Sequence, residues 1–169
     1  MATPTHATPS LRAHIPDLEA VIDREWRALD TERALPDPIA DELFDSDVLR
    51  MWTPRVLGGL ELDPVAGLEA IASLSALEGS VGWNAMILGA YTFFAGRLPE
   101  ATAERIWGDP RGAVAGALHP GGKAVECPGG HRVTGRWTFA SGCKHATWFL
   151  AQCMVERDGE IAMTPIGLP

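Results

Sequence analysis

The spacing of apolar residues changes near residue 110, and this change limits the folds open to the chain. Upstream, apolar residues recur every three or four positions, most clearly as Leu11, Ile15, Leu18, Ile22, Trp26 and Leu29. Beyond Gly108-Asp109-Pro110 glycines become frequent, and β-prone runs follow at about 112–118, 123–127, 131–140, 146–155 and 160–166. The sequence therefore predicts an α+β fold: a flexible tail over 1–10, an all-helical domain over 11–110 and a partial antiparallel β domain over 111–169.

Helix starts are marked by aspartate-proline pairs. Asp37-Pro38 and Asp63-Pro64 each place a capping carboxylate before a residue that suits a first helical turn. Ser80 is predicted to cap the next helix, which runs from Val81 to Leu98 and is apolar nearly all round. A helix of that kind is predicted to be buried on most sides.

Within the β part, Gly129-Gly130 predicts a tight hairpin, because paired glycines supply the positive φ that such a turn needs. The run from Thr147 to Val155 is apolar almost without alternation, which predicts a strand covered on both faces. A β part this short cannot bury such strands alone. We expect a partner subunit or a further C-terminal segment to cover them.

Composition excludes several classes of protein. The formal net charge is -8, and basic residues form no cluster, so nucleic acid is not an expected partner. The N-terminus has no apolar segment of a signal peptide and no later run could span a membrane, which predicts a cytoplasmic protein. Cys127, Cys143 and Cys153 are expected to be reduced thiols. Cys127 and Cys143 could join His119 and His145 at a metal, but no CxxC or HxxxH pair supports a metal site, and none is predicted.

The stretch from Gly129 to Gly142 holds the strongest candidate for a binding surface. Trp137 and Phe139 are two positions apart, so on a strand they would share one face, and Ser141 would continue it. A flat aromatic surface with a hydroxyl at its edge suits a planar heteroaromatic ligand. Aromatic residues at alternate strand positions are also common in ordinary cores, and both interpretations remain open on spacing alone.

Four stretches together resemble a known family: Pro54 to Glu61, Gly79 to Trp83, Ile106-Trp107 with Ala115 to Ala124, and Gly130 to Gly142. They resemble the acyl-CoA dehydrogenase superfamily, and within it the oxygenase components of two-component flavin-dependent monooxygenases. The p-hydroxyphenylacetate hydroxylase and dibenzothiophene monooxygenase belong to that group. The likeness covers roughly residues 10–155 and corresponds to the N-terminal half of those proteins.

The resemblance implies a flavin site around the last stretch. Phe139 takes the place of the family's tryptophan that packs on the isoalloxazine, and Ser141 takes the place of the hydroxyl residue near flavin N5. Phe-Ala-Ser-Gly, with Ala140 between them, is the form that the monooxygenase branch favours. Reduced flavin that reacts with oxygen needs an apolar, water-excluding surround, which Phe139 would provide, and Ser141 would be the catalytic hydroxyl.

Other site residues also come from the resemblance. Ala117-Leu118-His119 corresponds to a loop that contacts flavin or substrate; His119 is a candidate acid or base, or else a solvent-facing side chain. Tyr91 and Trp83 lie on the helix that contributes to the substrate pocket in the monooxygenase branch. A hydrogen-bonded core tyrosine and a packing tryptophan are the alternatives.

The implied function is hydroxylation of an aromatic or polycyclic substrate with O2 and reduced FMN or FAD, delivered by a separate flavin reductase, in a homo-oligomer. The C-terminal helical bundle, which carries the family's catalytic Glu or His, is absent from this sequence. We therefore expect an incomplete chain. An acyl-CoA dehydrogenase-like FAD enzyme acting on CH–CH bonds and a non-catalytic remnant that associates with a full-length relative remain alternatives, and the substrate and the choice of FMN or FAD stay open.

Overall fold

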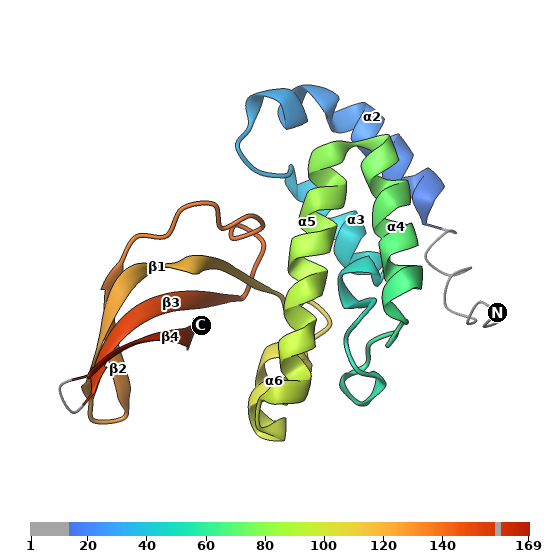
Figure 1. Ribbon diagram of the computed structural model, residues 1–169. Coiled ribbons are helices and arrows are strands. Elements are labelled where there is room, and N and C mark those ends of the chain that lie inside the picture. Colours follow the sequence, from blue (N-terminus) through green and yellow to red (C-terminus); the bar gives the residue numbers. More distant parts are fainter. Residues whose placement is uncertain (1–13, 158–159) are drawn as a thin grey trace.

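The computed structural model describes residues 14–157 and 160–169, in which helices precede a four-stranded sheet (Figure 1). The tail predicted over 1–10 lies outside these residues. The helices are α2 (Ile15–Thr31), α3 (Asp37–Asp45), α4 (Pro64–Leu77), α5 (Gly79–Ala90) and α6 (Glu100–Trp107), with 3-10 turns η1 (Val48–Arg50), η2 (Arg55–Leu57) and η3 (Tyr91–Arg97). The strands are β1 (Val114–Cys127), β2 (Gly130–Gly135), β3 (Trp148–Arg157) and β4 (Glu160–Leu168).

The predicted helix starts agree with the structure to different degrees. Asp63 caps α4 as predicted, because its carboxylate accepts hydrogen bonds from the backbone N–H groups of Val65 and Ala66. Helix α3 begins one residue early, with Asp37 already inside it. The prediction that Ser80 caps α5 is wrong. Glu78 is extended and its carboxylate accepts from the Val81 N–H at 2.8 Å, while Ser80 lies within the first turn and donates to the same carboxylate.

The helix predicted from Val81 to Leu98 is neither continuous nor buried all round. It changes at Tyr91 from α-helix to the 3-10 turn η3, and Trp83 and Phe93 expose half of their surface. Val81, Ala85 and Leu88 form its buried side, packed in the core with residues of α2, α3 and α4. A segment without contrast between apolar and polar sides carries no sequence signal for which side is covered.

The sheet has the order β2-β1-β3-β4, and the prediction that it is purely antiparallel is wrong. β1 with β2 and β3 with β4 are antiparallel, but β1 and β3 are parallel. The long connection over 136–147 returns the chain to the end of the sheet where β1 starts, and this return makes the central pair parallel. β1 also joins two predicted runs into one strand, with a register shift between Ala117 and Gly122.

Two other expectations for the sheet have different outcomes. The predicted hairpin is confirmed: Cys127 pairs with Gly130, and Gly129 has a φ of 87°. Within the described residues β3 is fully covered on one face, and the cover that we expect from a partner subunit or a further C-terminal segment stays a prediction. Ala151, Cys153 and Val155 are buried, whereas Met154 on the opposite face is exposed.

Arg50 joins the helices to the start of the sheet. It is only 5% exposed, and its guanidinium donates to the carbonyl oxygens of Trp107 (3.1 Å), Asp109 (2.9 Å) and Leu57. Burial lowers the pKa of the Arg50 guanidinium, and the charges of Asp47 and Asp109 oppose that change. These bonds tie η2 to the end of α6, directly before the chain enters β1.

We predict that Arg50→Lys lowers the free energy of unfolding by about 3 kcal/mol, because a lysine cannot reach all three carbonyl oxygens and leaves buried acceptors unpaired. Urea denaturation measures the loss. Arg24→Lys, at an exposed arginine that pairs with its neighbour Glu25, is the matched control and should change stability by less than about 0.5 kcal/mol. Equal effects of the two variants would contradict the role assigned to Arg50.

Candidate functional site

The segment that the sequence predicts as a strand over 131–140 is a strand only as far as Gly135, and a loop occupies 136–147. Trp137 turns inward: its Nε1 donates to the carbonyl oxygen of Gln152 at 2.8 Å, and its ring meets Phe149 edge-on. Phe139 instead points outward and is 94% exposed. The prediction that Trp137, Phe139 and Ser141 share one face is therefore wrong, because the regular alternation of a strand ends before them.

Phe139 combines two unfavourable features. Its φ of 58° lies in the left-handed region, which is rare and costly for a residue with a Cβ, and its large apolar ring is open to solvent. Strain of this kind persists only where surrounding contacts impose it, and it is concentrated at functional positions. Within the described residues the ring thus stays almost fully uncovered.

Ser141 is brought to the first part of α5. The Trp83 Nε1–H group donates to Ser141 Oγ at 2.9 Å, which joins two of the predicted site residues. Ala140 lies directly between Phe139 and Ser141 and is half-buried. We use the name loop group for Phe139 and Ser141 of the loop together with Trp83 of α5, which is bonded to it. Figure 1 shows the loop between β2 and β3 reaching toward the helices.

The loop around Ser141 is fixed by its own backbone and by the segment between α2 and α3. Backbone bonds run from the N–H groups of His145 and Ala146 to the carbonyl oxygen of Gly142. His145 Nε2 lies 3.0 Å from the carbonyl oxygen of Leu35, so this nitrogen carries the proton and donates. Gly142 lies so close to α5 that a Cβ there would be 2.7 Å from Leu88 Cδ2. This close approach and the positive φ of 79° at Gly142 together favour glycine here.

The β1 residues predicted to face a ligand separate into two environments. Ala117 is buried and pairs with Ala151, whereas Leu118 and His119 are exposed. The Arg136 N–H donates to the carbonyl oxygen of Gly121 at 3.0 Å, which links this irregular part of β1 to the beginning of the loop. Leu118 is therefore a second exposed apolar side chain on a segment bonded to the loop.

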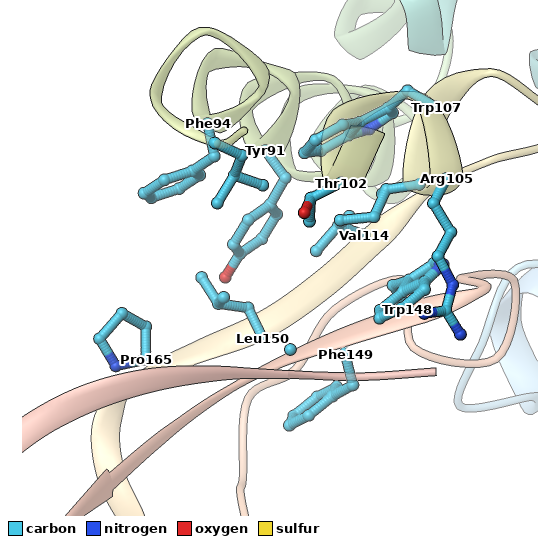
Figure 2. A pocket seen from close by; sticks show the side chains of 13 residues that line it. Tyr91, Phe94, Thr102, Arg105, Trp107, Val114, Trp148, Phe149, Leu150 and Pro165 are labelled. Carbon is cyan, nitrogen blue, oxygen red and sulfur yellow. The ribbon is translucent and has the colours of Figure 1, made fainter. Parts of the chain in front are cut away.

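Tyr91 faces a separate cavity of about 380 Å³ between the helices and the sheet (Figure 2). Tyr91 is 8% exposed, its hydroxyl points into the cavity, and no described residue forms a hydrogen bond with that hydroxyl. A Cβ at Gly116 would be 2.6 Å from the carbonyl oxygen of Leu150 and 2.8 Å from the Tyr91 hydroxyl, so β1 needs glycine here. The other lining residues are mostly apolar: Phe94, Leu98, Thr102, Arg105, Ile106, Trp107, Val114, Trp148, Phe149, Leu150, Pro165 and Gly167.

Sequence reasoning missed most of this cavity. Its lining comes from η3, α6, β1, β3 and β4, and no local motif marks residues that meet only through the sheet topology. The guanidinium of Arg105 lies 5.3 Å from the centre of the Trp148 ring at the cavity wall. Trp83, predicted with Tyr91 as a substrate contact, is not among the lining residues and belongs to the loop group.

The cysteine and histidine residues considered for a metal do not form a cluster. Among the described residues, the group of possible ligands with atoms close enough to share an ion is His14, Asp17 and Glu42 on the helical part.

No helix within residues 14–157 and 160–169 is long and apolar enough to cross a membrane.

Comparison with known proteins shows which proteins this chain is similar to in sequence, and the geometry of the site does not show this by itself. No protein-family profile matches the chain. Oxygenase subunit HsaA of a flavin-dependent monooxygenase from Mycobacterium tuberculosis is 32% identical over 151 residues, which are 89% of this chain and 38% of that protein. This chain is a homologue of flavin-dependent monooxygenase oxygenase components. The oxygenase component of an FADH2-dependent resorcinol hydroxylase from Rhizobium sp. is 34% identical over 60% of this chain and 25% of its own length.

Solved structures agree with this relationship. The crystal structure of the HsaA monooxygenase from M. tuberculosis superposes with a TM-score of 0.85 at 30% identity, over 96% of this chain and 45% of that one. XiaF from Streptomyces sp., solved in complex with FADH2 and glycerol, gives a TM-score of 0.82 at 27% identity, over 96% of this chain and 41% of XiaF. The chain thus spans about two-fifths of the length of these homologues.

Tyr91 offers a direct test of the cavity, because it is the only tyrosine in the chain. Burial raises the pKa of its phenol above the ordinary value of 10.0. The folded state therefore keeps the phenol proton at a pH where the unfolded chain loses it. The stability that this difference contributes is complete below the unfolded pKa and is lost as pH rises through the folded pKa. We predict that tyrosinate absorbance in native buffer rises at a higher pH than in urea.

The control for that titration is Tyr91→Phe, which should remove the absorbance step in both solvents. Identical midpoints for the native and the unfolded chain would show that the Tyr91 hydroxyl is solvated and would contradict the cavity described here.

Proposed function

We propose that this chain forms part of the oxygenase component of a flavin-dependent monooxygenase, which hydroxylates an aromatic substrate with O2 and reduced flavin. The observation that carries the proposal is Phe139, a strained and 94% exposed aromatic residue in a homologue of flavin-dependent oxygenases. A flavin ring is the planar apolar partner that would cover it. The homologues' full length exceeds that of this chain, so the activity is proposed for the whole enzyme.

The residues of the loop group fit a flavin. The exposed ring of Phe139 offers a flat apolar surface, and the Ser141 hydroxyl stands two residues further along the same loop. XiaF was solved with FADH2, and the resorcinol hydroxylase is named as FADH2-dependent, which supports reduced flavin as the cofactor. When bound, reduced flavin would supply the electrons that activate oxygen.

In this proposal the chain's own residues bind and orient the flavin and exclude water from it. Phe139 would pack on the ring and, with the exposed Leu118, would exclude water from it. Ser141 would offer its hydroxyl to the flavin near N5, and the small side chains of Ala140 and Ala117 would leave room for the ring. His119 is exposed and lies beyond Leu118 on β1, where it is available to the ligand as an acid or base.

The cavity beside Tyr91 is proposed to bind the aromatic substrate. Its volume of about 380 Å³ lies within the usual range for small-molecule sites, and its wall is mostly apolar with few polar groups. The unpartnered Tyr91 hydroxyl would form a hydrogen bond with a polar substituent of that substrate. A dedicated polar contact within an apolar pocket favours a hydroxylated aromatic over a plain hydrocarbon.

We also propose that a flavin reductase supplies the reduced flavin, that the enzyme assembles as a homo-oligomer and that it acts in the cytoplasm. Edge strand β4 supports association with further protein, because Ile161 and Met163 on it are exposed apolar residues. The resorcinol hydroxylase is named as an oxygenase component, which supports a separate reductase.

Phe139→Ala is expected to weaken the binding of reduced FAD or reduced FMN about tenfold, because stacking on an aromatic ring contributes about 1 kcal/mol or more. Anaerobic fluorescence titration measures the dissociation constants. Stability should be nearly unchanged, since the ring is exposed. Val56→Ala, at a residue 84% exposed on η2, is the control and should leave flavin affinity unaltered. No saturable binding by the unmodified chain, or equal binding by Phe139→Ala, would count against the proposal.

Tyr91→Phe is expected to weaken the binding of resorcinol about fivefold while leaving that of toluene unchanged, because only resorcinol can use the tyrosine hydroxyl. Calorimetric titration of both ligands provides the comparison. The variant should be at least as stable as the parent chain, since the hydroxyl has no partner among the described residues. An equal loss for both ligands would indicate a change in cavity shape and reject the assigned contact.

A further inference from the structure

The hydrogen bond from Trp83 to Ser141 joins residues 58 positions apart and connects α5 with the loop. We propose that Trp83 is a positioning residue: its indole N–H orients the Ser141 hydroxyl so that the serine proton faces a ligand bound on the loop. The inference rests on the proposed function, because the ligand in question is the flavin. It assigns Trp83 a role different from the substrate contact or core packing expected from the sequence.

The orientation follows from the chemistry of the two groups. An indole N–H is only a donor, whereas a serine hydroxyl has one proton and two lone pairs. With one lone pair occupied by the Trp83 N–H at 2.9 Å, the hydroxyl proton must point away from the indole. No other described residue forms a hydrogen bond with Ser141 Oγ, so its proton and second lone pair stay available. The edge of a flavin ring presents both acceptor and donor atoms to such a group.

Both partners stand on rigid supports, which makes the bond an orienting contact. On α5, Val81 and Ala85 on either side of Trp83 are fully buried. A Cβ at Gly82 would lie 2.0 Å from Ser75 Oγ, which shows how closely α5 packs on α4. On the loop, Gly142 packs against Leu88 with similarly little space. The backbone of both partners is therefore held in place, and the hydrogen bond from Trp83 limits the rotation of the Ser141 hydroxyl.

Packing alone does not account for Trp83. Its ring is 52% exposed and has no aromatic or cation–π partner among the described residues. Trp26 on α2 is a useful comparison, because it is 58% exposed but lies against the guanidinium of Arg27 and forms no bond to the loop. The polar end of Trp83, in contrast, is directed at a single acceptor in the candidate site.

A double-mutant cycle tests the proposal. Reduced FMN and reduced FAD are titrated anaerobically into the unmodified chain, Trp83→Phe, Ser141→Ala and the double variant, with Trp26→Phe as the matched control. Each single change should weaken flavin binding about fivefold, as expected for the loss of one hydrogen bond. The double variant should bind no more weakly than the weaker single variant, because Trp83 acts only through Ser141. Trp26→Phe should bind like the unmodified chain.

A second measurement needs no flavin. The indole N–H proton resonance that disappears in Trp83→Phe identifies Trp83, and Ser141→Ala should shift that resonance and speed its exchange with solvent, whereas Ser141→Thr should restore it. An unmoved resonance, or effects on flavin affinity that simply add, would overturn the positioning role. If the unmodified chain binds reduced flavin but the effects add, only this inference fails. If it binds neither reduced flavin, the proposed function fails and this inference with it.

Discussion

The buried guanidinium of Arg50 determines where the helical part of the chain passes into the sheet. Its bonds to the carbonyl oxygens of Leu57, Trp107 and Asp109 hold η2 against the end of α6. The chain enters β1 a few residues later, and Ala113 and Ala115 at that point belong to the main core with α5. A buried charge with several carbonyl partners is costly to disturb, so the start of the sheet has little freedom to move.

Both parts of the candidate site depend on that placement of β1 beside α5 and η3. Trp83, near the start of α5, meets the loop at Ser141, and Tyr91, at the start of η3, faces the cavity beside Gly116. The two are eight residues apart on the adjoining elements α5 and η3, which therefore set the spacing between the proposed flavin surface and the proposed substrate cavity. A shift of β1 along this segment would alter both contacts together.

The loop group also shows how strain and exposure are arranged around rigid elements. Trp137 anchors the start of the loop through its bond to the carbonyl oxygen of Gln152, and His145 anchors its end through the carbonyl oxygen of Leu35. Between these anchors Phe139 is held with a positive φ and an open ring. The anchors explain how an unfavourable conformation persists, and a flavin is the partner that we propose for the exposed ring.

Short-range features were predictable from the sequence, because their physical causes lie within a few residues. Asp63 caps α4 through N–H groups two and three positions away, the hairpin needs only the φ of Gly129, and the likeness to flavin oxygenases is read from contiguous motifs. Only the tertiary structure decided that β1 and β3 run parallel and that Trp137 turns inward while Phe139 turns outward. The Trp83–Ser141 hydrogen bond and the Tyr91 cavity were also decided only by the tertiary structure. Each depends on contacts between segments distant in sequence, which local spacing does not encode.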